Sequence, residues 1–243
     1  MRLSLRPAGG FDEQRATFHE GARALGGTLT QSSRWELAQL GDGSAAEGVA
    51  QLFEELAGDP AWLRDATQLR GEPLDDLVHT QAARRLLAAR RAAALVLFEV
   101  RRREGPQTAE AQAALYRKLL QRATFATLSD DDAARWALEA EPWMRSVTPL
   151  LGAVLEAQLE SAGWWKDPRS GDRLKKIWAG GRSLTALEAA RALGLTALDP
   201  GALAAAAAAQ LAYKAPDAPP PAPKPDYKYM QGDKKRRRKH KKH

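Results

Sequence analysis

Helix-forming patterns run along almost the whole chain, and this feature constrains the fold more than any other. Apolar residues recur three and four positions apart, which places them on one face of a helix. The clearest set of this kind is Val49, Leu52, Phe53 and Leu56. Only Met1–Arg6 alternates apolar and polar residues as a half-buried strand does, with Leu3 and Leu5 on one side. The sequence therefore predicts an all-α, multi-helix fold with one short N-terminal strand.

Turn and capping residues divide these patterns into separate helices. Asp12, Ser44 and Ser129 each stand where a side-chain oxygen can cap a helix N-terminus. Glu47 completes a capping-box frame with Ser44. The predicted helices cover residues 12–26, 74–103, 108–123, 129–139, 141–162 and 172–178. Another predicted helix begins at residue 44 and ends at Asp59-Pro60, and residues 183–185 begin a last pair of helices before Asp199-Pro200.

The positive charge of the chain is confined to its C-terminal end. The 31 residues from Tyr213 onward carry 11 Lys+Arg and 3 Asp+Glu, a net charge of +8, whereas the other 212 carry 26 basic against 27 acidic residues, a net charge of −1. The chain is therefore divided into a helical domain at residues 1–212, a proline-rich linker at 213–233 and a basic tail at 234–243. We expect the linker to be extended and solvated and the tail to be disordered.

The basic tail predicts an anionic partner. Eight cations in its ten residues can bind DNA, RNA or an acidic membrane surface by displacing counterions, with little sequence specificity. A tail that serves only solubility is the alternative. The cationic residues are Lys234, Lys235, Arg236, Arg237, Arg238, Lys239, Lys241 and Lys242.

Composition excludes some chemistry and some locations. The chain has no cysteine, so disulfides and thiolate chemistry are impossible. No run of about 18 apolar residues could form a transmembrane segment, and the N-terminus has no apolar signal core. We therefore expect a cytoplasmic protein without a transmembrane segment.

One short motif carries chemistry. Residues His19-Glu20-Gly21-Ala22-Arg23 have the frame H-E-x-x-H with arginine at the second histidine position. In that frame two histidines hold one zinc ion on a helix face, and the glutamate acts as general base on the zinc-bound water. Arg23 cannot replace a ligand, because its guanidinium stays protonated and offers no lone pair.

The surroundings of this motif resemble the M3 family of zinc metallopeptidases, the thimet oligopeptidase and oligoendopeptidase F group. Glu47 lies 28 residues after His19, and Gln51 and Glu54 follow it at the family's spacing. The segments Glu141-Pro142-Trp143, Leu155 to Leu159 and Trp164-Trp165 to Trp178 are also similar. The resemblance covers residues 1–212 and implies a zincin-type half-domain, the C-terminal part of the family's catalytic domain.

The resemblance implies a role for each matching residue. His19 falls at the first zinc ligand, Glu20 at the general base and Glu47 at the third ligand, while the second ligand position is Arg23. The family also uses downstream histidine and tyrosine residues for substrate and oxyanion binding, and residues 141–150 contain neither. If Arg23 points at Glu20 and Glu47, we expect a buried ion pair in place of the metal.

Three functions follow as hypotheses. The first is a degenerate, inactive metallopeptidase domain without a cofactor, acting as a binding or scaffold module, with a separate N-terminal half or another protein as partner. The second is an active zinc-dependent oligopeptidase that uses an altered site, a partner subunit or His79 as the missing ligand, although His79 has the pattern of an ordinary histidine. The third is nucleic-acid binding through the tail.

The arginines between residues 84 and 103 allow two interpretations. They form either a surface for an anionic ligand or the solvated face of an amphipathic helix, and we favour the solvated face. The residues are Arg84, Arg85, Arg90, Arg91, Arg101, Arg102 and Arg103.

Overall fold

The computed structural model describes residues 3–4, 7, 9–140 and 144–216, and within these ranges the chain is helical with no strand. The all-α prediction is therefore confirmed for the described residues. Of the predicted strand, only Leu3 and Ser4 are described, and neither is in a strand. The helices are α1 (Gly10–Leu29), α2 (Trp35–Gln39), α3 (Ser44–Leu56), α4 (Pro60–Thr67), α5 (Glu72–Glu104), α6 (Ala109–Thr124), α7 (Asp130–Ala134), α8 (Trp136–Glu139), α9 (Val147–Ser161), the 3₁₀ turn η2 (Trp164–Lys166), α10 (Ser170–Ala179), α11 (Ala186–Ala192) and α12 (Gly201–Leu211).

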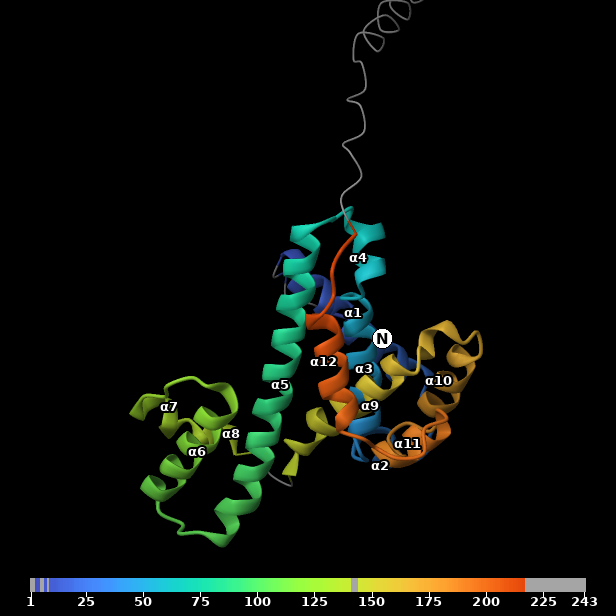
Figure 1. Cartoon of the computed structure of the whole chain (residues 1–243). Coiled ribbons are helices and arrows are strands. Elements are labelled where there is room, and N and C mark those ends of the chain that lie inside the picture. The colour runs from blue at the N-terminus through green and yellow to red at the C-terminus, as the bar shows by residue number, and fades with distance from the viewer. Residues whose placement is uncertain (1–2, 5–6, 8, 141–143, 217–243) are drawn as a thin grey trace, which may run out of the picture.

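The long helix α5 lies between two groups of helices (Figure 1). Helices α6 to α8 lie on one side of its C-terminal half, and the larger helical body lies on the other side (Figure 1). In that body α3 packs most extensively against α9, while α1 covers α3, and α12 lies against both α5 and α9. Leu52, Leu155 and Leu159 are almost fully buried between these helices.

Two glycines allow α3 and α9 to cross closely. A Cβ atom at Gly48 would lie 3.0 Å from the Gly152 carbonyl oxygen, and one at Gly152 would lie 3.0 Å from the Gly48 nitrogen and from Glu47 Cγ. These distances are shorter than ordinary van der Waals contacts. The crossing therefore depends on glycine at both positions, and it fixes where Glu47 lies relative to α9.

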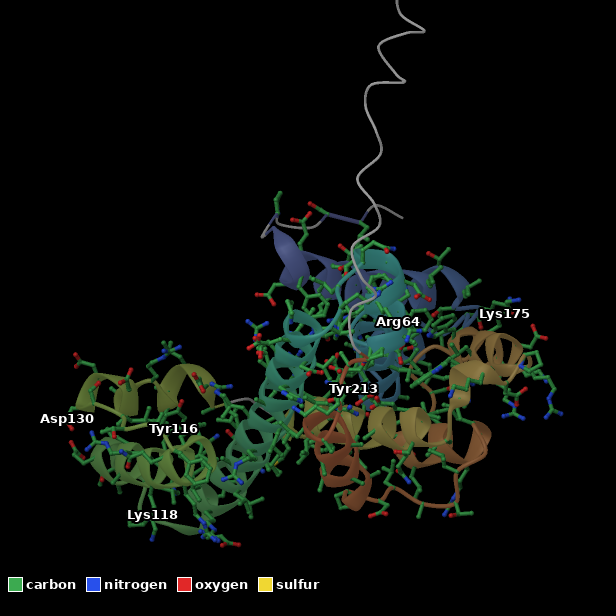
Figure 2. All side chains as sticks on the ribbon, turned by 45° about the horizontal axis from the view of Figure 1, so that its top comes forward. Arg64, Tyr116, Lys118, Asp130, Lys175 and Tyr213 are labelled. Carbon is green, nitrogen blue, oxygen red and sulfur yellow. The ribbon has the colours of Figure 1, made fainter. Side chains whose placement is uncertain are left out.

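A second, smaller core holds α6 to α8 on α5. Phe98 of α5 is fully buried and meets Tyr116 edge to face, with ring centroids 5.5 Å apart. Figure 2 places Tyr116 inside this lobe, and its hydroxyl donates a hydrogen bond of 2.7 Å to Glu139. Burial and this hydrogen bond raise the pKa of Tyr116 to about 12.

The predicted N-cap at Ser129 is confirmed. Ser129 accepts from the Asp132 amide while the Asp132 carboxylate accepts from the Ser129 amide, a complete capping box. The predicted helix 129–139 is nevertheless two helices, because the chain turns at Arg135. That turn lets the second helix bring Glu139 back over Tyr116.

Two predicted caps are wrong. Helix α1 begins at Gly10 after Gly9, whose φ of 74° suits glycine, so Asp12 lies inside the first turn. Ser44 is likewise inside α3 and makes no capping bond. Its amide instead donates to Asp42 Oδ1 at 2.8 Å, which leaves the Glu47 carboxylate available for contacts outside the helix.

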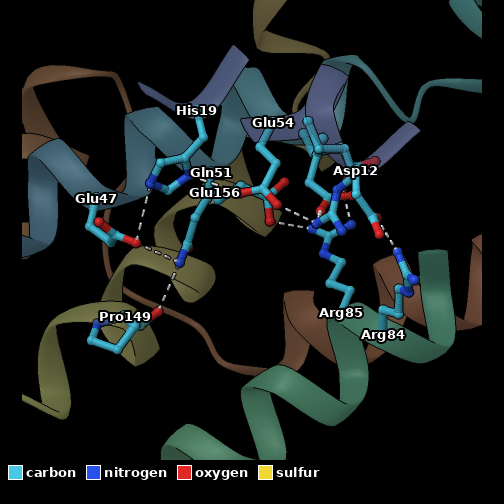
Figure 3. Close-up of polar contacts among 12 residues, drawn as sticks. Asp12, His19, Glu47, Gln51, Glu54, Arg84, Arg85, Pro149 and Glu156 are labelled. Carbon is cyan, nitrogen blue, oxygen red and sulfur yellow. Dashed lines mark hydrogen bonds and ion pairs between the residues drawn. The ribbon is translucent and has the colours of Figure 1, made fainter. Parts of the chain in front are cut away.

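The arginines of α5 are divided between the solvated surface and the packed interior. Arg85 is buried between α5 and α9, where it pairs with Glu156 and Glu160 at 2.5 Å each (Figure 3). Arg90 donates to backbone carbonyls at the end of α6. Arg84 pairs with Asp12, Arg91 with Glu139, and Arg102 and Arg103 with Glu99. The prediction of a solvated face holds for Arg84, Arg91, Arg101 and Arg103, which are exposed. It is wrong for Arg85, which is buried, and Arg90 and Arg102 are partly buried.

The described chain beyond α12 returns to the start of α5. His79 Nε2 donates to the Tyr213 carbonyl at 3.1 Å, and the Ala215 amide donates to Asp75 Oδ1 at 2.5 Å. Tyr213 and Ala215 pack on the buried residues Leu63, Leu74 and Val78. Residues 213–216, at the start of the predicted linker, therefore contact the body. The rest of the linker and the tail lie outside the described residues.

Candidate functional site

Helices α1 and α3 bring His19 and Glu47 together (Figure 3). His19 Nε2 lies 3.8 Å from Glu47 Oε1, and His19 Nδ1 donates to Glu54 Oε2 at 2.8 Å. Glu47 and Glu54 are seven residues apart, which is two helical turns, so both face α1 from the same side of α3. The pairing of the first and third predicted ligand positions is thus present.

This cluster already contains positive charge. The pKa of His19 is raised, chiefly because its ring donates a hydrogen bond to Glu54 and also because Glu47 and Glu20 add negative charge nearby, and these effects outweigh its burial. Arg15 supplies a second cation, 2.5 Å from Glu54 and 3.4 Å from Glu55. The carboxylates of α3 are therefore balanced by side chains of α1.

The donor set does not fit a catalytic zinc ion. Two ligands of one zinc lie about 2.0–2.1 Å from it, so the 3.8 Å between His19 Nε2 and Glu47 Oε1 is compatible with a shared ion. Catalytic zinc needs a third protein ligand, and Arg23 cannot be one. In the described part of the chain no group of three or more His, Asp or Glu side chains is arranged to hold a metal.

Arg23 does not form the predicted buried pair. Its Nη1 lies 3.7 Å from Glu20 Oε1 one turn earlier, and the two side chains are 47% and 41% exposed. Glu47 is held by other partners: besides His19, it accepts from Gln51 Nε2 at 3.3 Å. The expectation that Arg23 forms a buried ion pair in place of the metal is therefore wrong. Arg23 is half-exposed, and the Glu47 carboxylate contacts His19 and Gln51 instead.

Two hollows adjoin the cluster. The smaller one, about 300 Å³, is lined by Asp12, Arg15, Ala16, His19, Glu20 and Glu54. The larger one, about 1290 Å³, is a cleft lined by Arg23 and Glu47, the loop between α2 and α3, residues of α5 and α8, and the start of α9. The predicted general base and the predicted third ligand therefore line different hollows.

The sequence reading missed several residues of the site. Arg15 pairs with Glu54, and Glu54 accepts from His19. The sequence placed Glu54 in the resemblance but gave it no role, although its spacing of seven from Glu47 puts both on one face of the helix. Arg145 and Arg182 line the cleft, and no local pattern marks either of them. His79 is held by the Tyr213 carbonyl, so the described contacts do not bring it to His19 as a replacement ligand.

Comparisons with known proteins add no assignment, since no protein family, curated protein or solved structure matches this chain. In the described portion no helix is both long and apolar enough to cross a membrane. The predicted anion-binding residues 234–242 lie outside the described residues.

Proposed function

We propose that this chain is a catalytically inactive, metallopeptidase-like helical domain that acts as a peptide-binding module. The observation that carries the proposal is the pairing of His19 with Glu47 and Glu54, beside the cation Arg15, in a sequence that has Arg23 at the position of the second zinc ligand. In this arrangement Arg15 supplies positive charge to the carboxylates of α3. The resemblance to M3 peptidases supplies the peptide as the ligand class.

The chemistry of the site supports binding without hydrolysis. Hydrolysis of the metallopeptidase type needs a metal-bound water within reach of a general base. Here a third metal ligand is missing, and Glu20 lines the smaller hollow while Glu47 lines the cleft. The cleft, at about 1290 Å³, exceeds the 300–1,000 Å³ of common small-molecule pockets, and its size suits a ligand of several residues.

Zinc content and peptide cleavage test the inactive assignment. We expect the purified protein to contain no stoichiometric zinc and to cleave no peptide from a mixed library. Arg23→His should gain zinc, because His19 and Glu47 are already within reach of a shared ion. Arg64→His is the matched control, since Arg64 lies on α4 and lines neither hollow. Near-stoichiometric zinc in the parent, together with cleavage, would refute the proposal and establish the active oligopeptidase.

A second candidate function is nucleic-acid binding through the tail, favoured by the charge distribution. The body carries a net charge of −1 and the last 31 residues +8, so an electrostatic partner would bind the appendage alone. Each neutralised phosphate lowers log K by about 0.9 per unit of log salt on duplex DNA. The full chain should show a steep salt dependence in fluorescence anisotropy that deletion of residues 234–243 removes. Equal binding to anionic vesicles would instead indicate a general polyanion surface.

A further inference from the structure

The acidic residues of the large cleft already have partners. Asp42 accepts from the Ser44 amide at 2.8 Å, and Glu47 lies between His19 and Gln51. Glu139 accepts from the Tyr116 hydroxyl at 2.7 Å and pairs with Arg91. The cleft therefore has little free negative charge with which to attract a cation.

Its donors are less well satisfied. The Arg23 side chain is 47% exposed, and its ion pair with Glu20 is 3.7 Å long, which is too long for a hydrogen bond. Arg182 donates one Nη1 hydrogen bond, to the Gln39 carbonyl at 2.9 Å. A guanidinium carries five N–H donors, so both arginines keep donors for a ligand within the part of the chain that the structure describes.

Two helices also begin at the wall of the cleft, α3 at Gly43 and Ser44 and α9 at Ser146 and Val147. The Asp42 carboxylate already accepts from the Ser44 amide at α3, so the N-terminus of α9 is the one left for a ligand. The first amides of a helix lack intrahelical acceptors and carry partial positive charge, which makes such ends anion-binding positions. Ser146 gives an independent observation: it is 7% exposed, and its hydroxyl has no hydrogen-bond partner among the described residues.

We propose that this cleft binds the free C-terminal carboxylate of a peptide through Arg23, Arg182 and the N-terminus of α9. A planar carboxylate matches the fork of a guanidinium, which can hold both oxygens at once. The Ser146 hydroxyl, buried at the start of α9, would donate to the same group. The identity of the ligand as a peptide rests on the proposed function, whereas the oxyanion site rests on the cleft alone.

Two measurements on the full chain test the site and the ligand separately. In the first, acetate and phosphate are titrated while the Arg23 Nε–Hε signal and the Ser146 and Val147 amides are followed by NMR. In the second, random nonapeptides are prepared as free acids and as C-terminal amides, and their affinities are compared by anisotropy. Both are repeated with Arg23→Gln, Ser146→Ala and the control Arg64→Gln.

The expected result is that both anions shift the cleft signals and that free acids bind at least about tenfold more tightly than amides, the factor that 1.4 kcal/mol represents. Arg23→Gln should abolish the difference, and Arg64→Gln should preserve it. Equal binding of acids and amides, without anion shifts, would overturn the carboxylate site and leave peptide binding intact. Anion shifts without peptide binding would support the oxyanion site and overturn the peptide as its source. Failure of both would overturn both proposals.

Discussion

Replacing Arg85 by methionine should destabilise the protein strongly, because Arg85 is the cation of a buried charge cluster. The side chains of Arg85 and Glu156 are 5% and 2% exposed and 2.5 Å apart, and Glu160 lies 2.5 Å from the same guanidinium. Removing one partner of such a buried pair costs about 3–5 kcal/mol, since the remaining charge loses its compensation. We expect Arg85→Met to lie in that range.

The effect should depend on pH in a defined direction. Burial raises the pKa of Glu156 well above its usual value even beside Arg85, and loss of the arginine would raise it further. A carboxyl with a raised folded-state pKa favours folding below its unfolded pKa of about 4.3, and that contribution falls as pH rises toward the folded value. Arg85→Met should therefore lose more stability at pH 7.5 than at pH 5.

Urea denaturation followed by circular dichroism measures both effects. Arg84→Met is the matched control: Arg84 is the neighbouring arginine, its side chain is 48% exposed and its partner Asp12 is 58% exposed, so its loss should cost about 0–1 kcal/mol. Adding Glu156→Met to Arg85→Met should recover about half of the loss or more, because an apolar pair can replace a buried ion pair. Equal costs for Arg85→Met and Arg84→Met would refute the reasoning.

Three further predictions concern the helix crossing, the histidine and the smaller lobe. Gly152→Ala should cost about 1–3 kcal/mol by overpacking and move Glu47, seen as lower urea stability and shifted His19 NMR signals; Gly171→Ala, where a Cβ atom meets nothing within 4 Å, is the control, and equal effects would contradict the prediction. Because the pKa of His19 is raised above 6.5, its stabilising contribution should be complete below about pH 6.5 and be lost as pH rises through the folded value; a parent and His19→Gln with the same pH dependence would exclude this. Phe98→Ala should cost about 3–5 kcal/mol and speed amide exchange in α6 to α8 before the body, and uniform exchange would show that the two parts unfold together.

Local signals in the sequence identified most helices correctly. Helix patterns need only residues within a few turns, and the cap at Ser129 is formed by Asp132 three positions away. The errors at Asp12 and Ser44 have a physical reason of the same kind. Gly9 lets the backbone start α1 earlier, and Asp42 competes for the amide of Ser44.

The arginines show where local reasoning stops. The spacing of Arg84 and Arg85 on α5 was visible, but one is exposed and the other is buried. The difference arises from Glu156, 71 positions away. A helical pattern reports which residues share a face, and only packing decides what that face meets.

The same division holds at the candidate site. The sequence alone determined that arginine stands at the second histidine position of the H-E-x-x-H frame, where it has no lone pair to give a metal. It also placed His19 and Glu47 on separate helices that could meet. Only the tertiary structure decided that His19 joins Glu47 to Glu54, that Arg23 stays half-exposed at the wall of a cleft, and that α3 and α9 begin at that same cleft. These outcomes depend on which helices cross and how closely, and the crossing is set by distant pairs such as Gly48 and Gly152, whose contact no local pattern records.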